Sequence, residues 1–398
     1  MSADNTSTDL LVKLDGKEEI KATGTETWQL RNGTDVMSLM IDQRLDMPDE
    51  FEIRFVAEAE GTLTVFDWAK EGTQVELGFG SKQDGKIEVM FMGEVVFVEA
   101  EFGLDGAYVT LRGYDCSHRL HRSHEAKAFG KGKSPNQEPS DIAKQIIEAS
   151  GAKDASDGLT VTPGDPGNKS KYLPWTTQTP YKAIQDLYGT PRADHTTAGK
   201  IKFQKLSIQS NPVATVCYQG KRKEGGNSIN MINARFSIAT YPIFAKVRVH
   251  GWDPSQKKAF VEEITACSPD IDGAKGNKGW EAGWITVGKS LYKKETGAVY
   301  ERVANWCESS DEAKSVAQSI FDQYSLKYLT GEVSVPGCPL IQPGTVVDFF
   351  NFPSRLNGKV LVTAATHSLD SNNNGYTTTF SFCSNAAGTS KPALEENI

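Results

Sequence analysis

One β pattern occurs twice in this chain, once after Gly72 and again after Gly344. Each copy has three short runs that read as strands, and each run opens at a glycine. The runs span residues 72–77, 93–97 and 106–111 in the first copy, and 344–349, 358–362 and 375–380 in the second. Runs rich in β-branched and aromatic residues between turn residues are typical of strands. Two related β domains in one polypeptide favour a ring component built by duplication over an enzyme with a single pocket.

The length and composition set broad limits on the protein class. At about 150 residues per domain, 398 residues are enough for two to four domains. The net charge of −8 argues against a nucleic-acid-binding surface, which usually shows a basic patch. The polar start of the chain lacks a signal-peptide pattern, and no apolar run approaches the ~18 residues of a membrane helix. We therefore expect a protein made in the cytoplasm, without a membrane anchor and without specific nucleic-acid binding.

Residues 1–121 are predicted to form a first β domain. Alternation of apolar and polar residues predicts strands in addition to those of the first copy. They are expected at residues 9–14, 36–41 and 51–55. Six short strands separated by turn signals predict one antiparallel barrel or sandwich.

Residues 122–210 are predicted to form a small α+β domain. A polar, glycine-containing and proline-containing loop opens it. One helix is expected from the N-cap Ser140 onward, and a second helix from Thr179 to Gly189. A strand is expected at residues 201–203.

Residues 211–385 are predicted to form a second barrel, with a helical insertion around 265–330. The helix of this insertion is capped by Ser309 or Ser310, and its apolar residues recur with helical spacing. Residues 386–398 are polar and are expected to form a flexible tail. Further strands are expected at residues 245–252 and 332–335. The predicted fold class is mainly β with α+β insertions: two β-barrel domains plus a small α/β domain.

A cluster of metal-binding residue types lies at the end of the first domain. It contains Cys116, His118, His121 and His124. Their spacing matches no standard zinc pattern, and the charged neighbours make the stretch typical of a solvated linker. The six cysteines are scattered without a C-x-x-C pair, which indicates free, mostly buried thiols. We therefore predict no metal ligand, although the sequence leaves open whether this cluster or any cysteine binds a metal.

Residues 164–170 resemble a phosphate-binding loop but fail its pattern. Asn168 separates Gly167 from Lys169, and Pro166 removes a backbone N–H that a phosphate cradle would use. The stretch therefore favours a surface turn, and we predict no cofactor-binding residue.

The remaining candidates for chemistry are carboxylates and one tryptophan. Carboxylates gather at Asp46, Asp49, Glu50 and Glu52, where a turn before a strand is a simpler interpretation than an acid–base pair. No G-x-S-x-G elbow and no H-E-x-x-H motif is present. Trp252 ends a strand, which favours a structural corner. We therefore predict no catalytic residue.

Two stretches of the chain resemble the phage late control D proteins. They are residues 247–254, which read as a strand leading into a turn, and a closing stretch that contains 336–345, 356–362, 366–367 and 375–380. Members of this family are baseplate hub proteins of contractile phage tails, R-type bacteriocins and related injection systems. The front half of VgrG spike proteins shares their fold. The Gly72 stretch and the Ser140 helix lie where this family has its first barrel and its small α/β domain.

The resemblance implies a structural protein of a virion or an injection particle. Each protomer of a homotrimer would contribute two tail-tube-like barrels, so that three protomers form a pseudo-sixfold ring. The expected partners are the hexameric tail tube or a tube-initiator protein, the central spike and other baseplate proteins. The chain stops at Ile398 without an OB-fold or needle, so the spike is expected to be a separate polypeptide. Repeated acidic charge would give the ring a lumen that repels DNA or acidic cargo.

Three alternative functions stay open. A peptidoglycan hydrolase at the tail tip would need a carboxylate pair or a Cys/His site, which the motifs do not supply. A receptor-binding tail fibre would show several repeats with glycine-rich shafts, whereas only one duplication is visible. A VgrG-like component of a type VI secretion spike shares the resemblance. The sequence does not distinguish phage, bacteriocin and extracellular injection system.

Overall fold

A computed structural model gives the fold of the chain. It describes residues 8–18, 20–22, 28–30, 35–45, 47–57, 70–81, 86–104, 106–122, 128–129, 139–150, 160–161, 173–174, 193–197, 200–204, 207–220, 227–239, 243–271, 298–304, 307, 309–370 and 375–385. The described chain is mainly β, with a few helices, which confirms the predicted fold class. None of the described helices is long and apolar enough to cross a membrane.

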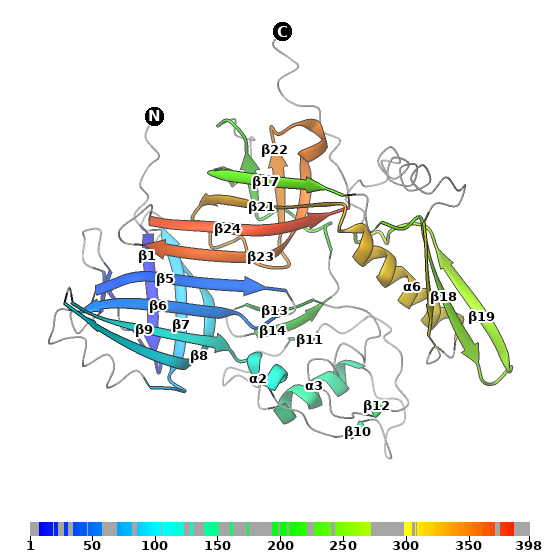
Figure 1. Cartoon of the computed structure of the whole chain (residues 1–398), viewed down its shortest axis with the longest axis horizontal. Coiled ribbons are helices and arrows are strands. Elements are labelled where there is room, and N and C mark those ends of the chain that lie inside the picture. Colours follow the sequence, from blue (N-terminus) through cyan, green and yellow to red (C-terminus); the bar gives the residue numbers. More distant parts are fainter. Residues whose placement is uncertain are drawn as a thin grey trace, which may run out of the picture.

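The N-terminal third of the chain forms one set of antiparallel strands around a buried core (Figure 1). The strands are β1 (Thr8–Leu14), β2 (Lys17–Glu18), β3 (Ile20–Ala22), β4 (Trp28–Leu30), β5 (Asp35–Arg44), β6 (Glu50–Ala57), β7 (Gln74–Ser81), β8 (Lys86–Gly103) and β9 (Gly106–Asp115). Alternate residues of β6, including Phe51, Ile53 and Phe55, are fully buried. This is the period-two pattern that the sequence predicts for a strand with one face on a core.

A second set of strands surrounds a second core. The strands are β15 (Ala214–Cys217), β16 (Ser228–Asn230), β17 (Asn233–Ile238), β21 (Leu329–Pro336), β22 (Val346–Phe350), β23 (Gly358–Asp370) and β24 (Gly375–Ser384), with a short 3-10 helix η1 (Ser354–Leu356). The centre of this core is aromatic: the rings of Phe349 and Phe382 lie 4.9 Å apart, and Phe236 packs against both. Edge-to-face aromatic packing adds to the area that the rings bury.

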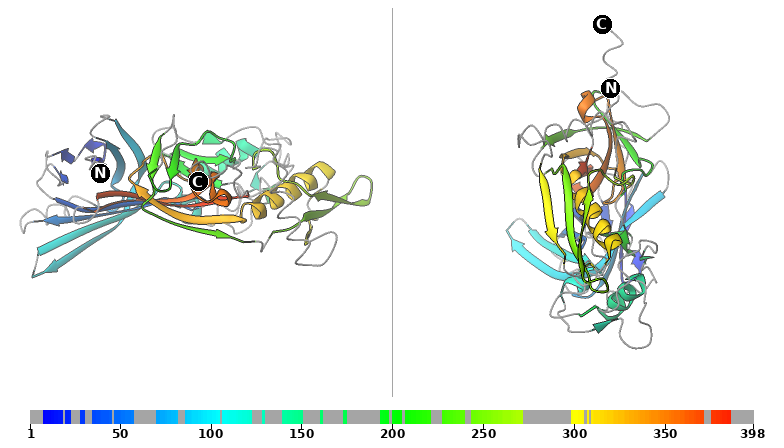
Figure 2. Two further views of the ribbon diagram at one scale, coloured as in Figure 1. Left: turned by 90° about the horizontal axis from the view of Figure 1, so that it is seen from above. Right: turned by 90° about the vertical axis from the view of Figure 1, so that its right-hand side faces the viewer.

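The two sets of strands belong to one sheet. Antiparallel pairing between β5 and β23 joins them, so the order β17-β21-β24-β23-β5-β6-β9-β8 runs without interruption (Figure 1). Seen from above, the β8–β9 hairpin, in cyan, projects from one end of the molecule (Figure 2). Among the described residues, this eight-strand run therefore ends at β17 on one side and at the second half of β8 on the other, while the first half of β8 continues the sheet into β7 and β1.

A small three-stranded sheet with one helix lies at the opposite end from the hairpin (Figures 1 and 2). It contains β18 (Lys246–Asp253), β19 (Lys258–Ile264) and β20 (Val299–Val303), and helix α6 (Ser310–Ser325) packs on it. Ser309 is the N-cap and accepts a hydrogen bond from the Glu312 N–H. The predicted cap and apolar stripe are confirmed, since Val316, Ala317 and Ile320 are buried on the sheet.

The segment between the two sets of strands contributes short elements. They are α2 (His118–Arg122), β10 (Ala128–Phe129), α3 (Pro139–Ser150), β11 (Thr160–Val161), β12 (Leu173–Pro174), β13 (Ala193–Thr197) and β14 (Lys200–Gln204). The helix predicted from Ser140 is present as α3, and the strand predicted at 201–203 is present as β14. The helix predicted from Thr179 to Gly189 lies outside the described residues. The predicted domain borders and the count of two barrels stay predictions.

Candidate functional site

The first copy of the repeat turns a corner just before β7, and backbone hydrogen bonds hold this corner to β8. The Gly72 N–H donates to the Val95 carbonyl at 2.7 Å, and the Val95 N–H donates to the Thr73 carbonyl at 2.9 Å. The Thr73 N–H donates to the Lys70 carbonyl at 3.1 Å. Gly72 has a φ of +86°, which favours glycine because it has no Cβ.

The second copy repeats this corner bond for bond. The Gly344 N–H donates to the Val362 carbonyl at 2.9 Å, and the Val362 N–H donates to the Thr345 carbonyl at 2.9 Å. The Thr345 N–H donates to the Gln342 carbonyl at 3.1 Å, and Gly344 has a φ of +81°. The predicted duplication is therefore present in the hydrogen bonding as well as in the sequence.

The pairing registers extend this correspondence to five strands of each copy. From here on, the first repeat is β5, β6, β7, β8 and β9, and the second repeat is β17, β21, β22, β23 and β24. A β-bulge after Val95 in the β8–β9 pair matches a bulge after Val362 in the β23–β24 pair. Bulges are built features that bend a strand, so a bulge at the same place in both repeats supports a common architecture.

One predicted correspondence is wrong. The sequence pattern aligns Gly93 with Gly358 and opens a strand at each, but Gly93 lies inside β8. The registers align Gly93 with Val360, because these residues face Val75 and Val347 in the two corners. Position 93 requires glycine for a different reason, because a Cβ there would overlap the Tyr114 carbonyl oxygen.

A phenylalanine–glycine pair occupies the same place in both repeats with the two partners exchanged. Phe51 on β6 faces Gly113 on β9, whereas Gly331 on β21 faces Phe382 on β24. In each case a Cβ on the glycine would lie about one bond length too close to the facing ring, at 2.5 Å and 2.6 Å. The ring covers its glycine, so each repeat fills the same volume from the opposite strand.

The junction between the repeats, here called the internal seam, pairs residues 38–44 of β5 with residues 364–370 of β23. On the buried side Leu39 faces Leu369, and each is 1% exposed. On the other side the Thr366 hydroxyl donates to the Asp42 carboxylate at 2.7 Å. The seam therefore has an apolar face and a hydrogen-bonded polar face.

A buried histidine lies on the apolar face of this seam. Nε2 of His367 lies 3.0 Å from the Ile341 carbonyl, which can only accept, so Nε2 carries the hydrogen. Nδ1 then accepts, and it lies 2.8 Å from the Tyr376 hydroxyl and 3.1 Å from Thr378 Oγ1. Burial lowers the pKa of His367 to about 3, so the ring is neutral at physiological pH.

The histidine cluster connects the two cores. The Tyr376 ring stacks on Phe79 of the first repeat, with centroids 4.2 Å apart. Burial also raises the pKa of the Tyr376 hydroxyl well above its usual value. Gly337 leaves room for this ring, because a Cβ there would overlap it. The residues at 336–338, 366–367 and 375–376 that carry the sequence resemblance therefore meet at the junction of the repeats.

The other face of the eight-strand run is polar. Arg112 donates to Glu52 at 2.6 Å, and Arg54 donates to Glu101 at 2.8 Å while lying over the Tyr108 ring. The hydrogen bond to Glu52 raises the pKa of Arg112. By strand alternation, acidic residues outnumber basic ones on this face: Asp42, Glu50, Glu52, Glu99, Glu101, Glu332 and Asp370 against Arg44, Arg54, Arg112 and Arg235.

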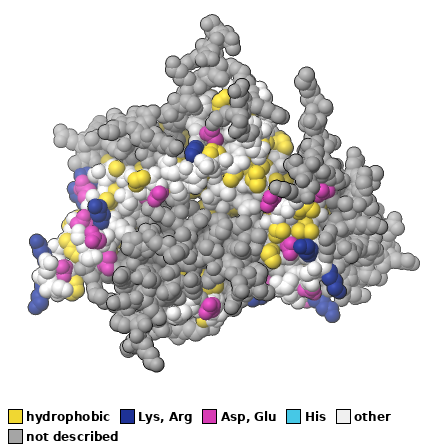
Figure 3. All heavy atoms as spheres, turned by 180° about the vertical axis from the view of Figure 1, so that it is seen from behind, with side chains coloured by type: hydrophobic (Ala, Val, Ile, Leu, Met, Phe, Trp, Pro, Cys, Tyr) yellow, Lys and Arg dark blue, Asp and Glu magenta, His cyan; other side chains and the backbone are white. Residues whose placement is uncertain are grey.

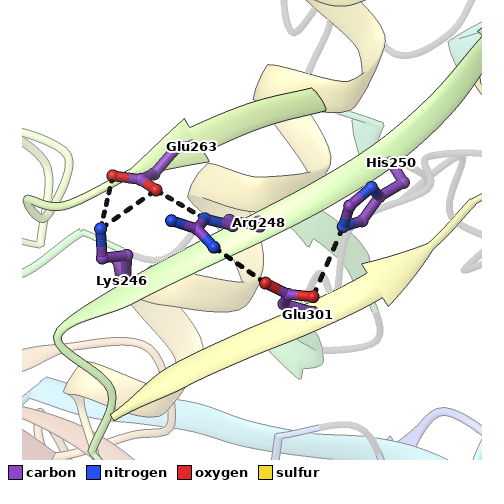
Figure 4. A network of polar contacts seen from close by, with 5 residues as sticks. All are labelled: Lys246, Arg248, His250, Glu263 and Glu301. Carbon is purple, nitrogen blue, oxygen red and sulfur yellow. Dashed lines mark hydrogen bonds and ion pairs between the residues drawn. The ribbon is translucent and has the colours of Figure 1, made fainter. Parts of the chain in front are cut away.

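A ladder of ion pairs covers one end of the small sheet (Figure 4). Arg248 on β18 contacts Glu263 at 2.7 Å and Glu301 at 3.0 Å, and Lys246 contacts Glu263 at 3.0 Å. Hydrogen bonds from Arg248 and Lys246 lower the pKa of Glu263, so its carboxylate stays ionised and is a poor proton donor. His250 lies 3.7 Å from Glu301. Seen from behind, basic and acidic side chains are likewise intermixed at the left edge of the molecule and toward its lower right (Figure 3).

In the cluster of metal-binding residue types at 116–124, both ring nitrogens of His118 contact other residues of the protein. Nδ1 of His118 lies 2.6 Å from the Asp115 carbonyl, and Nε2 lies 3.1 Å from Glu94. Arg119 contacts the other oxygen of Glu94 at 2.5 Å. These contacts fix helix α2 against the end of β9 and leave neither ring nitrogen of His118 pointing away from a protein partner.

The other members of that cluster add no ligand set within the described residues. Burial, with a smaller effect of His118, lowers the pKa of His121. His124 lies outside the described residues. No group of three histidine, cysteine or acidic side chains that could hold a metal is found in the part of the chain that the structure describes.

The remaining sequence candidates have local structural contacts or fall outside the described chain. The buried Asp49 accepts a hydrogen bond from Gln43 at 3.0 Å, and Glu52 pairs with Arg112. Trp252 precedes the predicted turn and is half exposed. Asp46 and residues 164–170 lie outside the described residues. The His367 cluster was missed as a site, although His367 and Tyr376 belonged to the stretch that carried the resemblance.

Three of the six free cysteines are expected to resist alkylation. Burial raises the pKa of Cys383 to about 12 and that of Cys307 to about 11, and it also raises the pKa of Cys338. Since the thiolate is the nucleophile, iodoacetamide at pH 8 should label Cys307 and Cys383 at least roughly a hundredfold more slowly in the native protein than in urea, and it should also label Cys338 more slowly. Peptide mapping by mass spectrometry measures this, and equal labelling in both states would contradict the prediction.

Solved structures with this fold include two tail proteins. The tail protein from Neisseria meningitidis MC58 matches with a TM-score of 0.62 and 14% identity, over 96% of this chain and 97% of that chain. The 43 kDa tail protein of prophage MuSo2 from Shewanella oneidensis matches with a TM-score of 0.62 and 14% identity, over 94% of this chain and 98% of that chain. The similarity covers nearly the whole of both proteins.

A third match is a chain of the PdpA–VgrG complex from Francisella, with a TM-score of 0.50 and 7% identity, over 97% of this chain and 60% of that chain. The family model described as the Alg8 N-terminal domain matches residues 193–371, which is less than half of the chain. No curated protein matches the chain in sequence. At these low identities, the structural matches show a fold shared with these tail proteins, one of them from a prophage, and with a chain of the PdpA–VgrG complex.

Proposed function

We propose that this protein is a structural baseplate hub of a contractile phage tail or a contractile injection system. In this role three protomers form a pseudo-sixfold ring that joins the hexameric tail tube to a central spike. The observation that carries the proposal is the duplication within a single sheet, with equivalent corners at Gly72 and Gly344. The shared fold with tail proteins supports it.

The duplication gives such a ring a physical basis. Six similar units from three chains can face a hexameric tube, while the chain itself needs only threefold symmetry. Two kinds of junction would then alternate around the ring, one within each chain and one between chains. Head-to-tail contacts of this kind form a closed ring when the rotation between units fits.

The polar face of the eight-strand run is proposed to line the channel of this ring. Acidic side chains outnumber basic ones there, and in the first repeat Glu52 and Glu101 are each paired with an arginine. Repeated around a ring, the excess of acidic charge would disfavour close approach of DNA or acidic cargo. In this proposal the protein has no catalytic role, and the spike and other baseplate proteins are its partners.

Light scattering on the purified protein tests the proposed ring. The expected mass is about three times the chain mass of 43.5 kDa. Trimerisation should be retained at moderate salt, because obligate interfaces are large and partly apolar. A protein that stays monomeric, both alone and when mixed with tube and spike proteins of the same particle, would contradict the proposal. Clearing of cell walls in a zymogram would instead favour the tail-tip hydrolase.

A further inference from the structure

We propose that the sheet continues from one copy of this chain into the next, with a strand register that the internal seam specifies. Strand β17 of one protomer would pair antiparallel with the second half of β8 of its neighbour, residues 97–103. This inference rests on the proposed ring and adds to it the strands, the register and the contacting side chains of the junction between chains.

The repeats define which edges are equivalent. The second half of β23, residues 364–370, pairs with β5 in the internal seam. The matching bulges make residues 97–103 of β8 the counterpart of that half-strand. The registers of β6 and β21 make β17 the counterpart of β5. Among the described residues, neither 97–103 nor β17 has a strand on its outer edge.

Large apolar side chains are exposed at both of these edges. Phe102 on β8 is 69% exposed, whereas its counterpart Leu369 in the internal seam is 1% exposed. Ile238 of β17 and Phe97 of β8 are also exposed. Unpaired strand edges with exposed apolar residues are templates for pairing with another chain. The exposure at these positions is therefore what the internal seam would show if its partner strand were removed.

When the register of the internal seam is applied to the junction between chains, the side chains that would become buried there have compatible sizes. In the internal seam the inward pairs are Leu369 with Leu39, His367 with Ile41, and Ala365 with Gln43. The corresponding pairs between chains are Phe102 with Ala234, Ala100 with Phe236, and Val98 with Ile238. Two of these pairs combine one aromatic ring with one alanine, which conserves volume across the junction.

The outward pairs of the same register also match in chemistry. In the internal seam the Thr366 hydroxyl donates to the Asp42 carboxylate. The counterparts are Glu99 and Ser237, so a carboxylate again faces a hydroxyl, with the two groups exchanged between the strands. A slip by one residue would break this pairing and turn the apolar set to the polar face.

The next outward pair carries opposite charges. Glu101 would face Arg235, at the place where Ser368 faces Met40 in the internal seam. Glu101 already contacts Arg54 within its own chain, so its carboxylate is held at this edge. Opposite charges directly across a strand pair are favourable and like charges are not, so the pair helps to select this register.

The two edges lie at opposite ends of the eight-strand run, so the partner that fits is a second copy in a head-to-tail arrangement. The β17 end of one chain meets the hairpin end of the next, and each chain keeps one edge of each kind for its two neighbours. Such a contact is heterologous, and it closes into a ring if the rotation per chain fits.

Disulfide cross-linking tests the register. Glu101→Cys and Arg235→Cys in one chain should give covalent dimers and trimers on non-reducing gels after mild oxidation. The matched control is Met40→Cys with Ser368→Cys, which should form an intrachain bond across the internal seam. Phe97→Cys with Arg235→Cys, displaced by four residues or roughly 13 Å, should not cross-link.

The possible outcomes distinguish a failure of the proposed junction from a failure of the proposed ring. Trimers that do not cross-link at 101 and 235, while the internal control does, would overturn the junction and leave the ring intact. Cross-linked ladders longer than three chains would support the junction and overturn the closed ring. A monomer without cross-links would count against both.

A substitution at the edge provides a second test. Phe102→Asp should convert the trimer into monomers without unfolding the chain, because this side chain is exposed. Val261→Asp is the control, since Val261 is exposed on the small sheet away from both edges. A trimer that tolerates Phe102→Asp as well as Val261→Asp would overturn the junction.

Discussion

Alanine at Gly113 or at Gly331 is expected to lower the free energy of unfolding by about 3 kcal/mol, the upper end of the usual cost of overpacking, because the added Cβ would meet backbone atoms. At Gly113 the new methyl group would overlap the Glu94 carbonyl oxygen and the Phe51 ring. At Gly331 it would overlap the Arg235 carbonyl oxygen and the Phe382 ring. A backbone oxygen inside a sheet ladder cannot move aside without breaking the ladder, so the strain is not relieved cheaply.

Urea denaturation at a fixed protomer concentration measures this effect, since association changes apparent stability. Arg112→Ala and Glu332→Ala are the matched controls, because they remove surface side chains next to each glycine. They should change the stability by about 1 kcal/mol or less. Glycine variants as stable as these controls would show that the facing phenylalanine can move, and that the exchanged pair is not a fixed feature of the repeats.

Much of the local structure could be predicted from the sequence. The strands at 51–55 and 245–252 follow from alternation, and the α6 helix follows from its cap at Ser309 and its apolar spacing. These patterns are local, so they can be interpreted from a short stretch of sequence without knowledge of the rest of the fold. The duplication was visible for the same reason, since each copy brings its own turn glycines at 72 and 344.

The register between the copies could not be predicted in this way. Gly93 and Gly358 look equivalent in sequence, but they are glycines for different reasons. Gly93 avoids a clash with a neighbouring strand, whereas Gly358 has a φ of +117° at the start of β23. The pattern of glycines therefore suggested an alignment that the hydrogen bonds correct by two residues.

The pairing of β5 with β23 in the internal seam also cannot be predicted from local sequence patterns. Its hydrogen bond between Thr366 and Asp42 joins residues 324 positions apart. Periodicity shows that a strand has a buried face, but not which distant strand completes the sheet. The same limit applies to His367: its partners come from separate segments, and only the fold shows that they meet.

The stability of the protein is expected to fall as the pH is lowered from 8 to 5, with His367 contributing about 2 kcal/mol of the loss. The folded pKa of His367, about 3, lies below the value of ~6.5 for imidazole in an unfolded chain. Within this window the unfolded state therefore binds a proton that the native state does not. The contribution is fully present above the unfolded pKa and is lost progressively on acidification.

The His367→Gln variant isolates this effect, because it removes the titrating group from the buried cluster. Its unfolding free energy should depend less steeply on pH between 8 and 5, whatever its absolute stability. His250→Gln, which removes a half-exposed histidine on the small sheet, should keep the full slope. His121 also has a lowered pKa and remains in both variants, so it does not affect their comparison. Equal slopes for the wild type and His367→Gln would mean that the junction of the two repeats admits a proton or water, and that the neutral histidine is not what holds it closed.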